Sequence, residues 1–422
     1  MSSEDAAPPD RLDRRLTTGD AVVIGMGSMI GAGIFAALRP AAEAAGAGLL
    51  IGLAVAAVIA YCNAASSAQL AAVYPESGGT YGFAGRRLGP FWGYLAGWGF
   101  VVGKTASLAA MALTFGLYAA PDLGRPLAVG AVVAMTAVNY VGIRKTALVT
   151  RLILAVVLAT LAAVLVGALL GGDPSPDNLG DLGRGGAWGI LRSGGLLFFA
   201  FAGYARIATL GEEVVNPRRA IPRAILVALT LVLILYGAVA VAALLAVGPE
   251  VLAESPAPLA AAVESGAFSS LVPAVRAGAA AASLGVLLSL LAGVSRTVFA
   301  MARNGEMPGP LGAVHPRFRT PHRAELAVAV VVVAVVLLAD LRDAIGFSSF
   351  AVLVYYGLAN LSAWTQPPQQ RRWPRIVQIV GVLGCALLAF TLPPVSVVTG
   401  LAVLAAGAAA WAILLRRRTA GP

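Results

Sequence analysis

The sequence has little charge and few of the side chains that catalysis and metal binding usually need. Of the 422 residues only 12% are charged, and there are two histidines and two cysteines. Soluble domains carry about 25% charged residues, so a water-soluble fold is excluded. Cys62 and Cys385 lie in apolar runs, and His315 and His322 lie in a polar loop. We therefore expect neither a structural disulfide nor a metal site.

Long apolar runs take the place of the missing charge. Hydrophobic residues make up 59% of the chain and gather in runs of roughly 17–25 residues, the length at which a helix crosses a bilayer. Strands of a membrane barrel would alternate over about ten residues instead. The sequence predicts an all-α polytopic membrane protein of about 12 transmembrane helices, at residues 21–38, 48–73, 91–119, 127–143, 147–170, 190–210, 224–247, 277–302, 324–339, 345–363, 376–392 and 395–415.

The net charge of +10 is explained by membrane topology rather than by nucleic acid. With the N-terminus in the cytoplasm, most of the 30 lysines and arginines fall in segments on the cytoplasmic side, as the positive-inside rule requires. We expect both termini to be cytoplasmic, the lipid bilayer of the cell membrane as a partner, and no nucleic acid. Residues 1–20 lack a cleavage site of small residues, so we expect no removable signal peptide.

The apolar runs carry no catalytic constellation. They lack an Asp pair, a His-Glu-x-x-His helix and a Ser/His dyad, the arrangements that support general acid–base, metal or nucleophilic chemistry. We therefore expect no enzyme, no catalytic residue and no cofactor.

Two of the apolar runs are interrupted by glycine. Residues 24–35 read Ile-Gly-Met-Gly-Ser-Met-Ile-Gly-Ala-Gly-Ile-Phe, and residues 198–206 read Phe-Phe-Ala-Phe-Ala-Gly-Tyr-Ala-Arg. Glycine costs about 1 kcal/mol per helix position relative to alanine. We therefore expect both helices to be discontinuous near the middle of the membrane.

Such breaks suit the binding of a small zwitterion. Irregular backbone at membrane depth is tolerated only where it faces protein or a water-filled cavity. The positive end of a half-helix can then bind an anionic group, and free carbonyls can bind a cation. Close packing is the alternative, because the spacing of Gly27 and Gly31 also lets helices approach. The breaks fall five spans apart, as an inverted repeat of five helices requires, which favours a binding site.

Several motifs then follow in a specific order. They are the glycine-rich residues 27–35, Tyr-Pro-Glu-Ser-Gly-Gly-Thr-Tyr at 74–81, Gly97-Trp98, Asn-Tyr-Val-Gly at 139–142, residues 198–204, Asn-Pro-Arg-Arg-Ala-Ile-Pro at 216–222, Ser295-Arg296, and Met-Ala-Arg-Asn-Gly-Glu-Met-Pro at 301–308. Through this ordered set, from about residue 20 to residue 364, the chain resembles the amino acid–polyamine–organocation (APC) superfamily of permeases.

The resemblance implies a fold and a division of the chain. The family has a LeuT-like five-plus-five inverted repeat in which helices 1 and 6 are discontinuous, and it works by alternating access. Carried over, this gives a disordered cytoplasmic tail at residues 1–17, a transport core at 18–366, and helices 11 and 12 with the cytoplasmic C-terminus at 367–422.

The resemblance also implies a substrate site. In the family, backbone donors of the first break bind the substrate carboxylate, carbonyls of both breaks bind its ammonium, and an aromatic side chain closes over it. By position the donors are those of Ile30, Gly31, Ala32 and Gly33, the carbonyls are those of Ile24, Met26, Gly27, Phe199, Ala200 and Ala202, and the aromatic gate is Phe199 or Phe201.

The chain departs from the family at charged positions. Proton-coupled members often carry a lysine where Val157 stands, and serine is frequent at Ala32. Lys104 and Arg206 instead lie at membrane depth, where a charge is costly unless it is paired or faces water. We hypothesise that Lys104 titrates and that Arg206 repels cationic substrates or pairs with a substrate acid. Structural roles, with Lys104 snorkelling or paired and Arg206 bound to carbonyls, are the alternatives.

Further groups are candidates for gating or coupling. Glu212 and Glu213 follow the second break and are expected to pair with nearby arginines, namely Arg218, Arg219 or Arg303, at an inner gate. Ser289 is a candidate for a sodium site, although a helix hydroxyl usually bonds its own backbone. Either H⁺ or Na⁺ is expected as the coupling ion. Residues 258–265 form either a short helix over the entrance or a plain loop.

The charge pattern narrows the substrate. No carboxylate lies deep in the expected pocket, where a polyamine or arginine would need one, so we expect a neutral or acidic amino acid. A permease or exchanger for polyamines or other organic amines is the first alternative, and a solute sensor that does not transport is the second. The sequence does not predict an oligomeric state.

Overall fold

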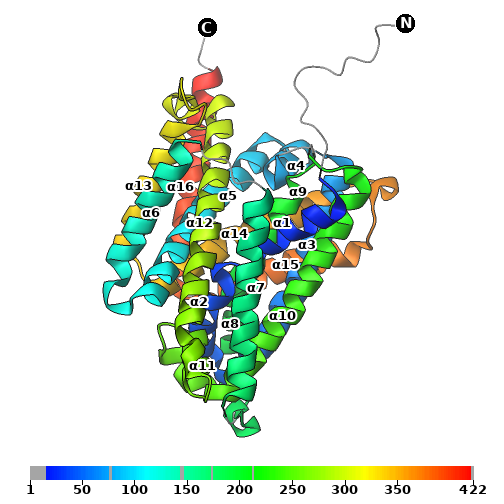
Figure 1. Ribbon diagram of the computed structural model, residues 1–422. Coiled ribbons are helices and arrows are strands. Elements are labelled where there is room, and N and C mark those ends of the chain that lie inside the picture. The colour runs from blue at the N-terminus through cyan, green and yellow to red at the C-terminus, as the bar shows by residue number, and fades with distance from the viewer. Residues whose placement is uncertain (1–15, 76–77, 143–146, 173, 212, 420–422) are drawn as a thin grey trace, which may run out of the picture.

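The described part of the chain is built from helices (Figure 1). The computed structural model describes residues 16–75, 78–142, 147–172, 174–211 and 213–419. Within these ranges the only strand-like pairing is an isolated parallel bridge between Leu16 and Val214. The predicted all-α class is therefore confirmed. The α-helices are α1 Thr18–Met29, α2 Ala32–Ala45, α3 Leu49–Val73, α4 Gly79–Arg87, α5 Pro90–Ala119, α6 Gly124–Tyr140, α7 Ala147–Leu170, α8 Gly186–Phe201, α9 Ala205–Ala208, α10 Pro217–Glu254, α11 Pro258–Glu264, α12 Val272–Arg303, α13 His322–Leu338, α14 Leu341–Trp364, α15 Arg375–Thr391 and α16 Pro394–Thr419.

Short 3₁₀ turns connect several of these helices. They are η1 Gly46–Gly48, η2 Pro121–Leu123, η3 Pro176–Leu179, η4 Ala202–Tyr204, η5 Ser269–Leu271, η6 Gly309–Gly312 and η7 Pro368–Gln370.

Eight segments in the described residues are long and apolar enough to cross a membrane. They are Ala32–Val73, Pro90–Ala119, Thr150–Leu170, Gly186–Ala208, Pro217–Glu254, Ser269–Arg303, Leu341–Trp364 and Pro394–Arg416. The other expected spans coincide with α1, α6, α13 and α15, which have 12 to 17 residues. The chain is thus a multi-pass membrane protein, whereas the count of twelve spans and the inverted repeat stay predictions.

The helices form two packed groups, and α14 contacts both of them. In one group α2 and α3 contact each other and both contact α8 and α10, and α1 lies against α10. In the other group α5, α6, α12 and α13 contact one another, and α14 packs against both α5 and α3. Figure 1 shows α4 and α9 toward one end of the bundle and α11 toward the other. The two broken helices belong to the first group.

The helix α11 settles one open point of the sequence. Residues 258–264 are helical, and Leu259, Ala260 and Val263 are fully buried against the body of the protein. Burial of these apolar side chains stabilises a helix that is too short to form alone. The short helix is therefore confirmed over the plain loop, whereas its place over the entrance stays a prediction.

Candidate functional site

The first break lies within the predicted glycine-rich run. The helix α1 ends at Met29, Ile30 (φ −79°, ψ 73°) and Gly31 (φ −126°, ψ −140°) leave the helical conformation, and α2 begins at Ala32. A helix that stops and restarts leaves carbonyls unpaired at its first end and N–H groups unpaired at its second. Both kinds of free backbone group therefore occur within a few residues.

At the second break the α-helix changes into a 3₁₀ turn instead of unwinding. The helix α8 ends at Phe201, Ala202–Tyr204 form the 3₁₀ turn η4, and the four residues of α9 follow. A 3₁₀ segment has poorer hydrogen-bond geometry than an α-helix and often marks a hinge. The expected discontinuity is present, but it leaves fewer free carbonyls than a fully unwound segment.

The two breaks lie directly against each other. A Cβ atom at Gly33 would lie 2.7 Å from the Cα atom of Ala200, and a Cβ atom at Gly203 would lie 2.6 Å from the amide nitrogen of Met29. Distances this short leave no room for any side chain. These glycines let the backbones of the two broken helices touch, so close packing accounts for both of them.

Gly27 differs from the other glycines of the first break. A Cβ atom at Gly27 would have Thr150 Cγ2, 3.7 Å away, as its nearest neighbour, whereas one at Gly31 would lie 3.2 Å from the Cβ atom of Val286. Ordinary van der Waals contact begins at about this longer distance. Packing therefore explains Gly31 but not Gly27, which borders more open space.

Two of the four predicted anion donors are engaged in this conformation. The Ile30 N–H donates to the Met26 carbonyl at 2.6 Å, and the Gly31 N–H donates to the Met29 carbonyl at 2.8 Å. Ala32 and Gly33 open α2, where N–H groups have no intrahelical partner, and no side chain caps this end. Both residues are buried. Their N–H groups, which have no partner within α2, are the candidate anion donors of the site.

Most of the predicted ammonium acceptors already have donors. The Ile24 carbonyl accepts the Ser28 hydroxyl at 2.8 Å, and Met26 is engaged as described. In the second break the Phe199 carbonyl accepts the Ala202 N–H, while Ala200 accepts a weak hydrogen bond of 3.4 Å from Tyr236. The Gly27 carbonyl is different. In a continuous helix it would accept the Gly31 N–H, but that N–H donates to the Met29 carbonyl instead. The Gly27 carbonyl therefore lacks the donor that a continuous helix would supply.

The Ala202 carbonyl accepts hydrogen bonds from two side chains. The Lys104 ammonium donates to this oxygen at 3.3 Å from α5, and the Tyr356 hydroxyl donates to it at 3.0 Å from α14. Lys104 is 8% exposed, so it is buried rather than snorkelling to an interface. The cation at the second break is thus a lysine of the protein itself.

Arg206 follows this break in the short helix α9. It is exposed although it falls within a candidate membrane span, and its guanidinium donates to the Thr209 hydroxyl at 3.2 Å. It interacts electrostatically with Glu213 and Arg296. The guanidinium therefore binds a hydroxyl in this structure rather than backbone carbonyls.

The two candidate gate aromatics have different surroundings. The Phe201 ring is fully buried and packs 5.4 Å from the Tyr236 ring, measured between centroids. Phe199 is 7% exposed. An aromatic side chain that moves during transport needs a free face, so Phe199 fits the gate better and Phe201 fits the core.

Two tyrosines of the site were missed from the sequence. The Tyr236 hydroxyl donates to the Met29 carbonyl at 2.6 Å, so it joins α10 to the first break, and Tyr356 joins α14 to the second. A buried tyrosine usually finds a partner for its hydroxyl. Tyrosines in the middle of otherwise apolar spans were the available signal.

The predicted inner gate is not formed as expected. Glu212 lies outside the described residues. Among the described residues, Glu213 makes no ion pair with the arginines predicted as its partners, Arg218, Arg219 and Arg303. Its backbone carbonyl instead accepts the Leu16 N–H at 3.0 Å, and the Leu16 carbonyl accepts the Val215 N–H at 2.9 Å. Backbone pairing, rather than side-chain charge, ties the start of α1 to this loop.

The candidate coupling groups show no assembled ion site. The Ser289 hydroxyl donates to the Gly285 carbonyl of its own helix at 3.1 Å, and Val157 is buried. Across the residues that the structure describes, no group of three or more His, Cys, Asp or Glu side chains is placed to hold a metal ion.

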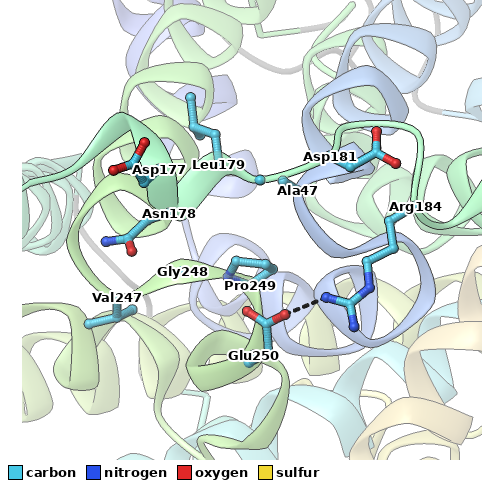
Figure 2. A pocket seen from close by; sticks show the side chains of 11 residues that line it. Ala47, Asp177, Asn178, Leu179, Asp181, Arg184, Val247, Gly248, Pro249 and Glu250 are labelled. Carbon is cyan, nitrogen blue, oxygen red and sulfur yellow. Dashed lines mark hydrogen bonds and ion pairs between the residues drawn. The ribbon is translucent and has the colours of Figure 1, made fainter.

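A pocket of about 200 Å³ lies apart from the two breaks (Figure 2). It is lined by η3, by the loop that follows it and by the kinked end of α10, where Arg184 pairs with Glu250 at 2.6 Å. Asp177 and Asp181 line it as well, and none of the predicted site residues does. Its walls are connecting segments, so it is separate from the candidate substrate site.

Comparisons with known proteins agree with the resemblance. The family model described as "Amino acid permease" matches residues 20–366. An uncharacterized transporter of Mycobacterium tuberculosis (strain H37Rv) is 60% identical, covering 96% of this chain and 92% of its own. The branched-chain amino acid permease BcaP of Bacillus subtilis is 26% identical over 93% and 86%. Human cationic amino acid transporter 4 is 29% identical over 84% and 60%. The chain belongs to the amino acid permease family, a group of multi-pass membrane transporters.

Proposed function

We propose that the protein is a secondary active transporter that moves a neutral or acidic amino acid across the cytoplasmic membrane. The observation that carries this proposal is the pair of buried N–H groups of Ala32 and Gly33, which have no partner within α2 and open that helix where it touches α8. A helix N-terminus of this kind binds a carboxylate. The Gly27 carbonyl of the first break has lost its usual intrahelical donor, the Gly31 N–H, and is the proposed acceptor for the substrate ammonium.

The arrangement of the helices supports transport by alternating access. The group that holds both breaks, α1 to α3 with α8 and α10, rocks against α5, α6, α12 and α13, each group being internally packed. In this proposal the chain has twelve spans, a five-plus-five inverted repeat and both termini in the cytoplasm. Phe199 closes over the substrate.

The position of the N-terminus can be tested with a cysteine engineered at Ser2. If the N-terminus is cytoplasmic, an impermeant thiol reagent should react with this cysteine only after intact cells are opened.

The substrate can be identified by testing amino acids and amines as ligands of the purified protein. A ligand raises the stability of the folded state with its occupancy, by about 2.7 kcal/mol at 100 times its Kd. We expect thermal unfolding of the purified protein, scanned against the twenty amino acids and common amines, to shift upward for neutral or acidic amino acids. Saturable uptake of putrescine without competition from any amino acid would instead support an amine permease.

A coupling ion, H⁺ or Na⁺, drives the transport cycle in this proposal, with Lys104 as the titrating group and Ser289 as the candidate sodium ligand. The buried ammonium of Lys104 has a carbonyl rather than a carboxylate as its partner. Its charged form is therefore stabilised less than in an ion pair, which supports Lys104 as the candidate titrating group. Proteoliposomes containing Lys104→Ala are expected to lose proton uptake with substrate. Undiminished pH-driven transport would exclude Lys104 as the titrating group.

A further inference from the structure

The ammonium of Lys104 is held at the centre of the protein without an acidic partner. This ammonium donates a hydrogen bond to the Ala202 carbonyl. Within the described residues no Asp or Glu side chain lies within ion-pair distance of it. A buried charge normally has a counter-ion. Here a carbonyl of the second break takes the place of one, so the positive field of Lys104 is not cancelled locally.

That carbonyl is one of the positions where a substrate ammonium was expected to bind. Tyr356 donates to the same oxygen at 3.0 Å, and a carbonyl oxygen has two lone pairs. With both donors in place the Ala202 carbonyl is saturated. The substrate ammonium is left with the carbonyls of the first break, of which that of Gly27 lacks its usual intrahelical donor.

Several charges near the second break are positive. Lys104 is buried, and the exposed Arg206 and Arg296 interact with each other. Glu213 attracts Arg206, and the buried Glu325 interacts with Arg296, so the nearby carboxylates act on the arginines rather than on Lys104.

We propose that Lys104 is a resident cation that occupies the second break and makes the substrate site reject amines with an additional positive charge. This inference rests on the proposed function and names the charge class of its substrate. Two unit charges several ångströms apart in a protein repel enough to weaken binding by about tenfold or more. Zwitterionic and acidic amino acids are accepted, whereas arginine, lysine and putrescine are excluded.

The experiment compares ligand-induced thermal stabilisation of the full-length protein across charge variants. The ligands are the neutral and acidic amino acids, arginine, lysine and putrescine. Lys104→Gln and Lys104→Met remove the charge, Lys104→Arg keeps it, and Tyr356→Phe removes the other hydrogen bond to the same carbonyl without changing any charge. Wild type and Lys104→Arg are expected to respond to a neutral or acidic amino acid and not to the three cations. Tyr356→Phe is expected to keep the same preference between these charge classes at whatever affinity it retains, because it leaves the charge of Lys104 in place.

In Lys104→Gln or Lys104→Met, the affinity for at least one of the three cations should rise about tenfold or more relative to the best neutral ligand. If Tyr356→Phe relaxes the selection as much as Lys104→Gln, the lysine only supports the break and the inference is overturned. Equal stabilisation of wild type by cationic and neutral amino acids overturns it too, even should neither neutral variant fold. If no amino acid or amine stabilises wild type, the proposed function fails, and this inference fails with it.

Discussion

The Tyr236 hydroxyl donates a hydrogen bond of 2.6 Å to the carbonyl of Met29, the last residue of α1. This contact fixes the end of the first half-helix to α10, and the same hydroxyl reaches the Ala200 carbonyl at 3.4 Å. One side chain from a third helix therefore touches both breaks. The position of the candidate anion donors of α2 relative to α8 depends on it.

Tyr236→Phe should impair substrate binding more than folding. Met29 keeps the hydrogen bond from the Gly31 N–H, so the stability loss should be only about 1 kcal/mol. Affinity measured by ligand-dependent thermal shift should fall several-fold because the breaks are less well aligned. Tyr118→Phe is the matched control, since its hydroxyl bonds the Phe35 carbonyl. Equal affinity in the two variants would contradict this role.

Gly203→Ala should destabilise the fold sharply. The new methyl group would lie 2.6 Å from the Met29 amide nitrogen, and overpacking costs about 1–3 kcal/mol, so the melting temperature should drop. Gly237→Ala in α10 is the control, because a Cβ atom there meets no atom within 4 Å. It should be neutral or stabilising by up to about 1 kcal/mol. Similar melting temperatures for both variants would show that the breaks do not touch.

Phe199→Ala and Phe201→Ala should separate gating from packing. Phe201 is fully buried against Tyr236, so its truncation should cost about 3–5 kcal/mol of stability. Phe199 keeps some exposure and should lose transport rate with a smaller change in melting temperature. The assay is uptake into proteoliposomes beside thermal unfolding. A Phe199 variant with wild-type uptake would remove this residue from the gate.

Asp20 should stabilise the start of α1 except in strong acid. Hydrogen bonds from the Thr17 backbone and side chain, followed by the ion pair with Arg151, lower the pKa of its carboxyl group. A lowered pKa gives stability that is present above the ordinary Asp value of about 3.9 and is lost as pH falls through the folded-state pKa. The melting-temperature difference between wild type and Asp20→Asn should be constant from neutral pH down to about pH 5 and shrink below about pH 4. A difference that already disappears near neutral pH would contradict it.

The local pattern predicted the breaks but not their internal bonding. Clustered glycine weakens a helix wherever it occurs, so the irregular residues Ile30 and Gly31 fall inside the predicted run. Which N–H groups lack a partner depends on the exact backbone conformation of the turn. Here the N–H groups of Ile30 and Gly31 donate to carbonyls of α1, the half-helix that precedes them. No residue-by-residue correspondence could show that.

Contacts between helices that are distant in sequence could not be predicted either. Lys104 was singled out because a charge is costly at membrane depth, but its partner on Ala202 lies 98 positions away in sequence. Tyr236 and Tyr356 stand out as tyrosines within apolar spans, but that pattern does not show which backbone carbonyls they bond. The pairing of Leu16 with the loop after α9 depends equally on the fold, and it replaced the ion pairs expected for Glu213.

Counterflow in proteoliposomes tests the central claim most directly. Vesicles containing the purified protein are loaded with an unlabelled neutral or acidic amino acid and diluted into a trace of the labelled compound. We predict transient accumulation of label above equilibrium, abolished by Gly203→Ala and absent from protein-free vesicles. Stabilisation by the amino acid without any accumulation of label would contradict transport and identify a solute sensor on the same fold.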